Sequence, residues 1–204
     1  MPKHLKALLL AICLSPGGLL AIEEPRFTVE AKTATYEIRT YAPIIVAETA
    51  VAAPFEDAGN RGFRLLADYI FGNNRSRAKL AMTAPVTQQV PSEKLAMTAP
   101  VIQVPASEGF LIQFTMPSGF TLATLPEPNN PLVRLRELPA RRVAVLTYSG
   151  SWSEARYQAK LKSFLATLQQ DGLRRTGAPV FARFNSPFQL PFLRRNELWI
   201  EVAA

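Results

Sequence analysis

The stretch TATYEIRTYAPIIVAETAVAAPFEDAGNRGFRLLADYIFG, residues 33–72, decides the fold class. Over 33–41, side chains alternate between two faces, which predicts a half-buried β-strand whose solvent face carries Glu37 and Arg39. The run 44–51 is rich in β-branched residues and predicts a second strand. Two adjacent strands therefore lead directly into the segment that follows.

That segment, 55–72, predicts an amphipathic helix, because apolar residues recur every three to four positions and Gly72 ends the pattern. Gly59 and Gly62 cost such a helix roughly 1 kcal/mol each relative to alanine. Glycines of this kind allow another backbone or a flat ligand to approach closely. We expect the simpler of the two here, packing of the helix on a sheet.

The same order of elements recurs after the proline-rich stretch PEPNNP, 126–131. A second helix is predicted over 152–171, with Ser151 and Glu154 as a capping box. Further strands are predicted over 110–117, 131–138, 142–149, 178–185 and 197–203. Short, proline-punctuated strands favour antiparallel pairing, so we expect an α+β fold of two similar halves.

One octapeptide, KLAMTAPV, occurs twice, at 79–86 and 94–101. Each copy alternates apolar with small or polar residues, and its proline is tolerable only at an edge or a bulge. We expect a local duplication that lengthens a hairpin. The pattern leaves open which copy is the core strand.

The first 21 residues are typical of a secretory signal peptide, with Lys3 and Lys6 before an apolar stretch. We expect cleavage after Ala21 and a periplasmic or secreted protein without a stable membrane span. Lipidation of Cys13 and an uncleaved membrane anchor are the alternatives. Cleavage would remove the only cysteine and the only histidine, His4, and would lower the formal net charge from +7 to +5. For an exported chain we expect no nucleic-acid partner.

Four stretches spread over nearly the whole exported chain resemble the SOUL haem-binding protein family. They are YEIRTYAP at 36–43, KLAMTAPV after the first helix, YSGSWSEARYQAKL at 148–161 and FNSPFQLPFLRRNELWIEV at 184–202. The resemblance implies two pseudo-symmetric halves forming a distorted antiparallel β-barrel flanked by two helices, similar to gyrase-inhibitor-like ligand-binding domains. It implies a single domain over 26–204, with halves 26–117 and 132–204 and a linker over 118–131.

The resemblance also implies a ligand, haem or another tetrapyrrole bound without a covalent link. Some family members are proposed to ligate haem iron through a histidine directly after YE-[IV]-R, and here that position is Thr40. Other members resemble binders that use an apolar groove with no obligatory axial ligand. Carried onto this chain, that groove involves Asn60, Phe63 and Leu66 on the first helix and Phe192 and Arg194 on the loop before the last strand.

Such a site is physically reasonable, because a porphyrin is a flat apolar plate with two carboxylates that arginine can pair with. The ordinary alternatives are core packing for Phe63 and Leu66, and a structural pair of Arg194 and Arg195 with Glu197. Met82, Met97 and Met116, and the tyrosines 36, 41 and 69, are interpreted as packing residues rather than axial ligands. We therefore expect no metal-ligating residues.

Catalysis is not expected. Without histidine or cysteine after cleavage, a nucleophilic triad and a histidine- or thiolate-based metal site are both excluded. Glu48 or Glu137 could serve only in a carboxylate-based hydrolase. The leading hypothesis is a monomeric, non-enzymatic tetrapyrrole-binding protein. The alternative is an envelope module that binds another small apolar ligand or a protein partner.

Overall fold

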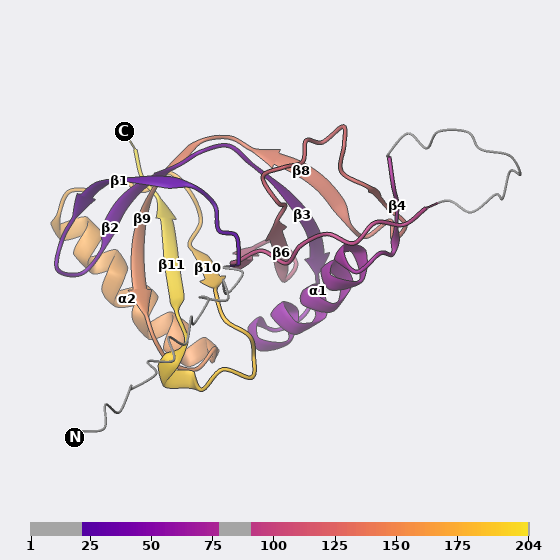
Figure 1. Ribbon diagram of the computed structural model, residues 1–204. Helices are drawn as coiled ribbons and strands as arrows, with labels where there is room; N and C mark the ends of the chain where they lie inside the picture. Colours follow the sequence, from indigo (N-terminus) through magenta and orange to yellow (C-terminus); the bar gives the residue numbers. More distant parts are fainter. Residues whose placement is uncertain (1–21, 78–90, 204) are drawn as a thin grey trace, which may run out of the picture.

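The computed structural model describes residues 22–77 and 91–203, and within them the chain forms two long helices and a curled antiparallel sheet (Figure 1). In chain order the elements are β1 (Phe27–Lys32), β2 (Glu37–Tyr41), β3 (Ile44–Val51), α1 (Phe55–Ile70), β4 (Asn74–Arg75), β5 (Val101–Pro105), β6 (Phe110–Thr115), β7 (Glu127–Pro128), β8 (Arg134–Leu138), β9 (Arg141–Tyr148), α2 (Glu154–Gln170), β10 (Val180–Arg183), the 3₁₀ turn η1 (Pro191–Leu193) and β11 (Asn196–Glu201).

Nine strands form one sheet in the order β1-β2-β9-β11-β10-β5-β6-β3-β8, and every pair is antiparallel. The order is symmetric about the β10–β5 pair, with β2, β9, β11 and β10 on one side matching β8, β3, β6 and β5 on the other. Each half thus contributes a strand to the other half, since β2 pairs with β9 and β8 pairs with β3. The expected two-half α+β fold is confirmed, with a sheet that curls but whose outermost strands, β1 and β8, are not paired to each other.

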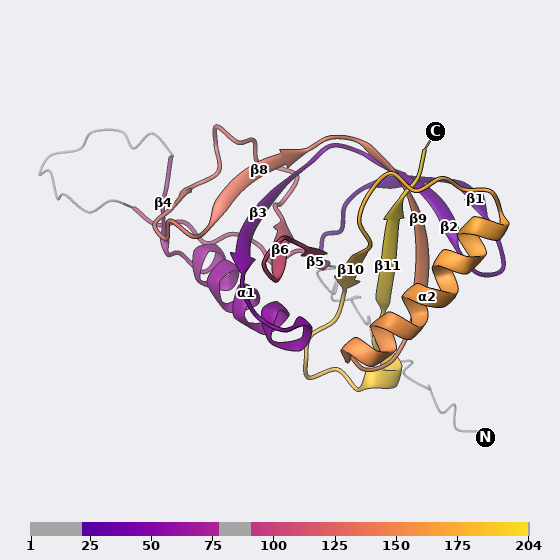
Figure 2. The ribbon, with the colours of Figure 1, turned by 180° about the vertical axis from the view of Figure 1, so that it is seen from behind.

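Each helix covers one half of the sheet, as the view from behind makes clear (Figure 2). Helix α2 packs on the half containing β9 and β11, through buried Tyr157, Phe164 and Leu168. Helix α1 packs on β3 and β6. The expected capping box is wrong, because the helix begins after Ser153, whose side chain makes no capping hydrogen bond; the backbone N–H of Glu154 donates instead to Glu56 of α1.

The two glycines of α1 each face a different neighbour, so each is required for a different reason. A Cβ atom on Gly62 would lie 2.4 Å from Cγ1 of Ile112, a fully buried residue of β6. A Cβ atom on Gly59 would instead lie 2.2 Å from Nη2 of Arg183, at the end of β10. Gly62 therefore serves helix–sheet packing, as expected, whereas Gly59 makes room for a guanidinium group.

The sheet is buried on both faces in its β2–β9–β11–β10 half, which the alternation of the sequence did not predict. One face packs on α2, and the other faces the inside of the curl, where Tyr41, Val143 and Trp199 form a separate core. Arg39 also lies on this inner face and is only 6% exposed, so its predicted place on a solvent face is wrong.

The two KLAMTAPV copies differ in what the structure describes. Residues 79–86 lie outside the described residues. In the second copy, residues 94–100 form no regular strand, so the predicted hairpin strand is wrong there; β5 begins only at Val101. Leu95 and Ala99 are buried, and the Ala99–Pro100 peptide bond is cis. The second copy is thus an irregular, partly buried lead into a central strand.

Residues between the halves pack on the end of α1. Leu125 is fully buried, β7 pairs with β4, and the Tyr69 hydroxyl donates to the carbonyl of Pro126 at 2.9 Å. Among the helices of the described residues, none is long and apolar enough to cross a membrane.

Candidate ligand-binding groove

A groove of about 420 Å³ lies where the two halves meet. Its walls come from the middle of α1, the MTAPV segment that leads into β5, Trp152 in the turn before α2, and the loop after β10. Most of the side chains that line it are apolar. They include Phe63, Met97, Trp152, Phe184, Pro187 and Phe188.

The α1 wall holds two of the three helix residues expected there. Asn60 and Phe63 line the groove, and the Phe63 ring packs edge-on against Phe114, with centroids 5.3 Å apart. Leu66 is fully buried in the core beneath the helix and does not line the groove. Leu66, about one turn after Phe63, therefore packs in the core with the sheet rather than in the groove.

The loop wall differs from the expectation. Phe192 lies in η1, is 68% exposed and is not part of the lining, whereas Phe188 lines the groove and is 94% exposed. Arg194 donates from Nε to the Gln189 carbonyl at 2.8 Å and from Nη2 to the Pro187 carbonyl at 2.7 Å. Arg194 therefore holds the loop in shape rather than pointing free donors at a ligand.

Two cations line the groove, the exposed Arg64 and the buried Arg183, and neither is among the residues predicted for it. The guanidinium carbon of Arg183 lies 5.0 Å from the ring centre of Trp152, and the residue is only 7% exposed. Within the described part of the chain, no hydrogen bond or ion pair reaches Arg183, and its Nε is buried without a partner. Burial lowers the pKa of Arg183 to about 10, so the group is still charged at neutral pH.

The three tyrosines considered as iron ligands are hydrogen-bonded or buried in ways that disfavour ligation. Tyr36 donates to Asp171 at 2.7 Å, and this bond raises the pKa of Tyr36 to about 12. Burial raises the pKa of Tyr41 to about 12 and that of Tyr69 above its usual range. Tyrosinate, the form that binds iron, is therefore disfavoured at all three positions.

Thr40 and the methionines are the remaining positions to consider as iron ligands. The Thr40 hydroxyl donates to Glu30 beside the edge strand β1, away from the groove lining. Met116 is buried in the core, and Met82 lies outside the described residues; among the described methionines, Met97 is the one that lines the groove. Residues 22–77 and 91–203 contain no cluster of three or more histidine, cysteine or acidic side chains that could hold a metal ion.

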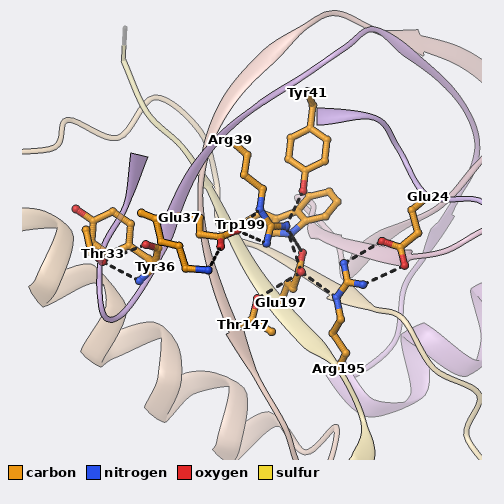
Figure 3. Close-up of polar contacts among 11 residues, drawn as sticks. Glu24, Thr33, Tyr36, Glu37, Arg39, Tyr41, Thr147, Arg195, Glu197 and Trp199 are labelled. Atoms are coloured by element: carbon orange, nitrogen blue, oxygen red, sulfur yellow. Dashed lines mark hydrogen bonds and ion pairs between the residues drawn. The ribbon is translucent and has the colours of Figure 1, made fainter. Parts of the chain in front are cut away.

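A buried ion-pair network lies inside the curl of the sheet, apart from the groove (Figure 3). The Glu197 carboxylate is fully buried and accepts from Arg39 at 3.2 Å, from Arg195 at 3.1 Å and from the Trp199 indole at 2.7 Å. Burial alone would lower the pKa of Arg39, but the Glu197 carboxylate raises it above its ordinary value. The alternative of a structural pairing with Glu197 holds for Arg195, whereas Arg194 donates to loop carbonyls instead.

The fold and the groove together define the class: an α+β protein of two strand-exchanging halves with an apolar groove where they meet. A sequence model of the family described as SOUL heme-binding protein matches residues 22–201. Heme-binding protein 2 of Mus musculus is 30% identical over 176 residues, which cover 84% of this chain and 80% of the mouse protein. Heme-binding protein 2 of Homo sapiens is 30% identical over 169 residues, 81% and 77% of the two chains. The chain belongs to the SOUL heme-binding protein family.

Solved structures share the fold at low identity. The EcmrR C-terminal domain superposes with a TM-score of 0.54 at 12% identity, over 82% of this chain and 98% of that one. A protein described as a hydrolase from Listeria innocua gives 0.52 at 12% identity, over 85% and 94%. These likenesses concern the fold alone.

Proposed function

We propose that the protein binds haem or another tetrapyrrole, without a covalent link, in the groove between α1 and the loop after β10. The main support for this proposal is an apolar groove at the junction of the halves in a member of this family. Four aromatic side chains line it, Phe63, Trp152, Phe184 and Phe188. Two relatives that match most of the chain are named heme-binding proteins.

The groove suits a flat plate better than a compact ligand. Its volume of about 420 Å³ lies in the range of small-molecule sites. Aromatic faces stack on a macrocycle and remove apolar surface from water, which stabilises the complex by roughly 25 cal/mol per Å² buried. The exposed Phe188 gains most from such a contact.

We propose further that iron needs no protein ligand for binding and that the protein is not an enzyme. Residues 22–204 contain no histidine or cysteine, and Met97 is the thioether available in the described groove. Glu48, the strongest acid candidate for catalysis, is paired with Arg136 at 3.0 Å and with Gln113 at 2.8 Å. Export to the periplasm or beyond remains a proposal that rests on the first 21 residues.

Two phenylalanines on one loop give a matched test. Haemin titrated into the protein should shift the Soret band and quench Trp152. Phe188→Ala should weaken haemin binding about tenfold, because the lost aromatic contact contributes about 1–2 kcal/mol. Phe192→Ala changes another exposed phenylalanine outside the groove lining and should leave the affinity within about twofold.

The proposal fails if haemin produces only the spectrum of nonspecific uptake, or if the two variants weaken binding equally. The alternative, a groove for a different small apolar ligand or a protein partner, is supported by Thr40 at the family's histidine position. Native mass spectrometry that recovers a non-tetrapyrrole ligand, displaced by Phe188→Ala, would establish that alternative.

A further inference from the structure

Arg183 is a buried charge for which the described protein supplies no counter-charge. Its side chain lies between Gly59 of α1 and the ring of Trp152, with 7% of the residue exposed. Taking an unpaired cation out of water costs several kcal/mol, and the usual outcome is a paired or hydrogen-bonded group. Proteins tolerate such a cost where the charge serves a ligand.

The surroundings of Arg183 contain no acid that could neutralise it. Among the residues that line the groove, none is acidic. A second cavity of about 300 Å³ shares Asn60, Trp152 and Arg183 with the groove, and its one acid is Glu56. Glu56 is exposed, accepts a hydrogen bond from the backbone N–H of Glu154 at 3.2 Å and forms no ion pair with Arg183.

The neighbouring arginine does not share this position. Arg194 lies over the same indole ring, 4.3 Å from its centre, but its donors go to two loop carbonyls. Arg183 therefore has uncommitted N–H donors at the place where the apolar groove meets the more polar second cavity.

We propose that Arg183 anchors a carboxylate of the ligand, so that the groove selects tetrapyrroles carrying free propionates over esterified or uncharged ones. This rests on the proposed function, because it names the chemistry that the same groove requires. A guanidinium pairs with a carboxylate through two parallel N–H···O bonds, and burial keeps water from weakening them. Gly59 contributes by leaving the space that the guanidinium occupies.

The test compares protoporphyrin IX with its dimethyl ester, both followed by quenching of tryptophan fluorescence. For the unmodified protein, the diacid should bind at least about tenfold more tightly than the ester, the range expected for one charge-assisted pair. Arg183→Met should remove most of that preference by weakening the diacid alone. Arg61→Met, on the exposed side of α1 and outside the groove lining, should preserve it.

Thermal unfolding without ligand gives a second readout. Since Arg183→Met removes an unpaired buried charge and keeps an unbranched apolar stem, the melting temperature should rise or stay level. A clear fall would mean that Arg183 is a structural residue, and equal binding of diacid and ester by unmodified protein would also overturn the inference. Failure of both porphyrins to bind at all would instead refute the proposed function.

Discussion

Replacing Gly62 with alanine should destabilise the protein, whereas the same replacement at Gly59 should not. At Gly62 the new methyl would lie 2.4 Å from Cγ1, 2.5 Å from Cβ and 2.9 Å from Cγ2 of Ile112. Ile112 is fully buried and β-branched, so it has no free rotamer to move into. Overpacking of this kind costs about 1–3 kcal/mol.

The magnitude follows from setting that cost against helix propensity. Alanine favours a helix interior over glycine by about 1 kcal/mol. Gly62→Ala should therefore lower the free energy of unfolding by up to about 2 kcal/mol. At Gly59 the methyl meets the end of the flexible Arg183 side chain, so Gly59→Ala should leave stability unchanged or raise it by up to about 1 kcal/mol.

Urea unfolding followed by far-UV circular dichroism measures both changes in the same helix. Gly59→Ala should also weaken binding of the porphyrin diacid, because it displaces the guanidinium that holds the carboxylate, while Gly62→Ala should leave the affinity of the folded protein unchanged. Equal loss of stability in the two variants would refute the distinction between a packing glycine and a glycine that makes room for a charge.

Two further predictions concern charged groups outside the groove. Glu197→Ala should lower the free energy of unfolding by about 3–5 kcal/mol in urea, because it removes the fully buried carboxylate that Arg39 and Arg195 share and leaves Arg39 with Glu37 alone. Glu127→Ala at an exposed pair should cost under about 1 kcal/mol, and similar losses in the two variants would contradict the buried network. Hydrogen bonds from Lys32 and Arg39 lower the pKa of Glu37 below its ordinary 4.5, so this contribution to stability is present above pH 4.5 and is lost as the pH falls through the lower value in the folded state. Glu37→Gln should flatten the pH dependence of the melting temperature in that acidic range, and an unchanged slope would exclude the effect.

The architecture could be predicted from the sequence because each helix and strand has its own periodic pattern of apolar residues. The strand–strand–helix order of each half and the position of α2 follow from residue spacing alone. The exchange of β2 and β8 between halves does not, because pairing partners far apart in the chain leave no local signal. Arg39 was misplaced for a related reason: alternation distinguishes two faces of a strand but not a curled sheet that buries both.

The site was only partly accessible to sequence reasoning. Asn60 and Phe63 reach the groove, but Leu66, three residues further along the same helical stripe, points into the core. Phe188 and Phe192 have similar local contexts, and only the path of the loop separates them. Arg183 looks like an ordinary strand residue until its neighbours are known, since the absence of a partner is a property of the folded chain.

The most direct test of the central claim is to compare the affinity for metal-free protoporphyrin IX with that for haemin, in protein carrying His4→Ala so that the only imidazole is removed. If apolar contacts and a carboxylate pair hold the plate, the two dissociation constants should agree within about threefold, and Met97→Leu should change neither by more than that. Haemin that binds at least about a hundredfold more tightly than the metal-free ring, with an absorption spectrum altered by Met97→Leu, would contradict the account.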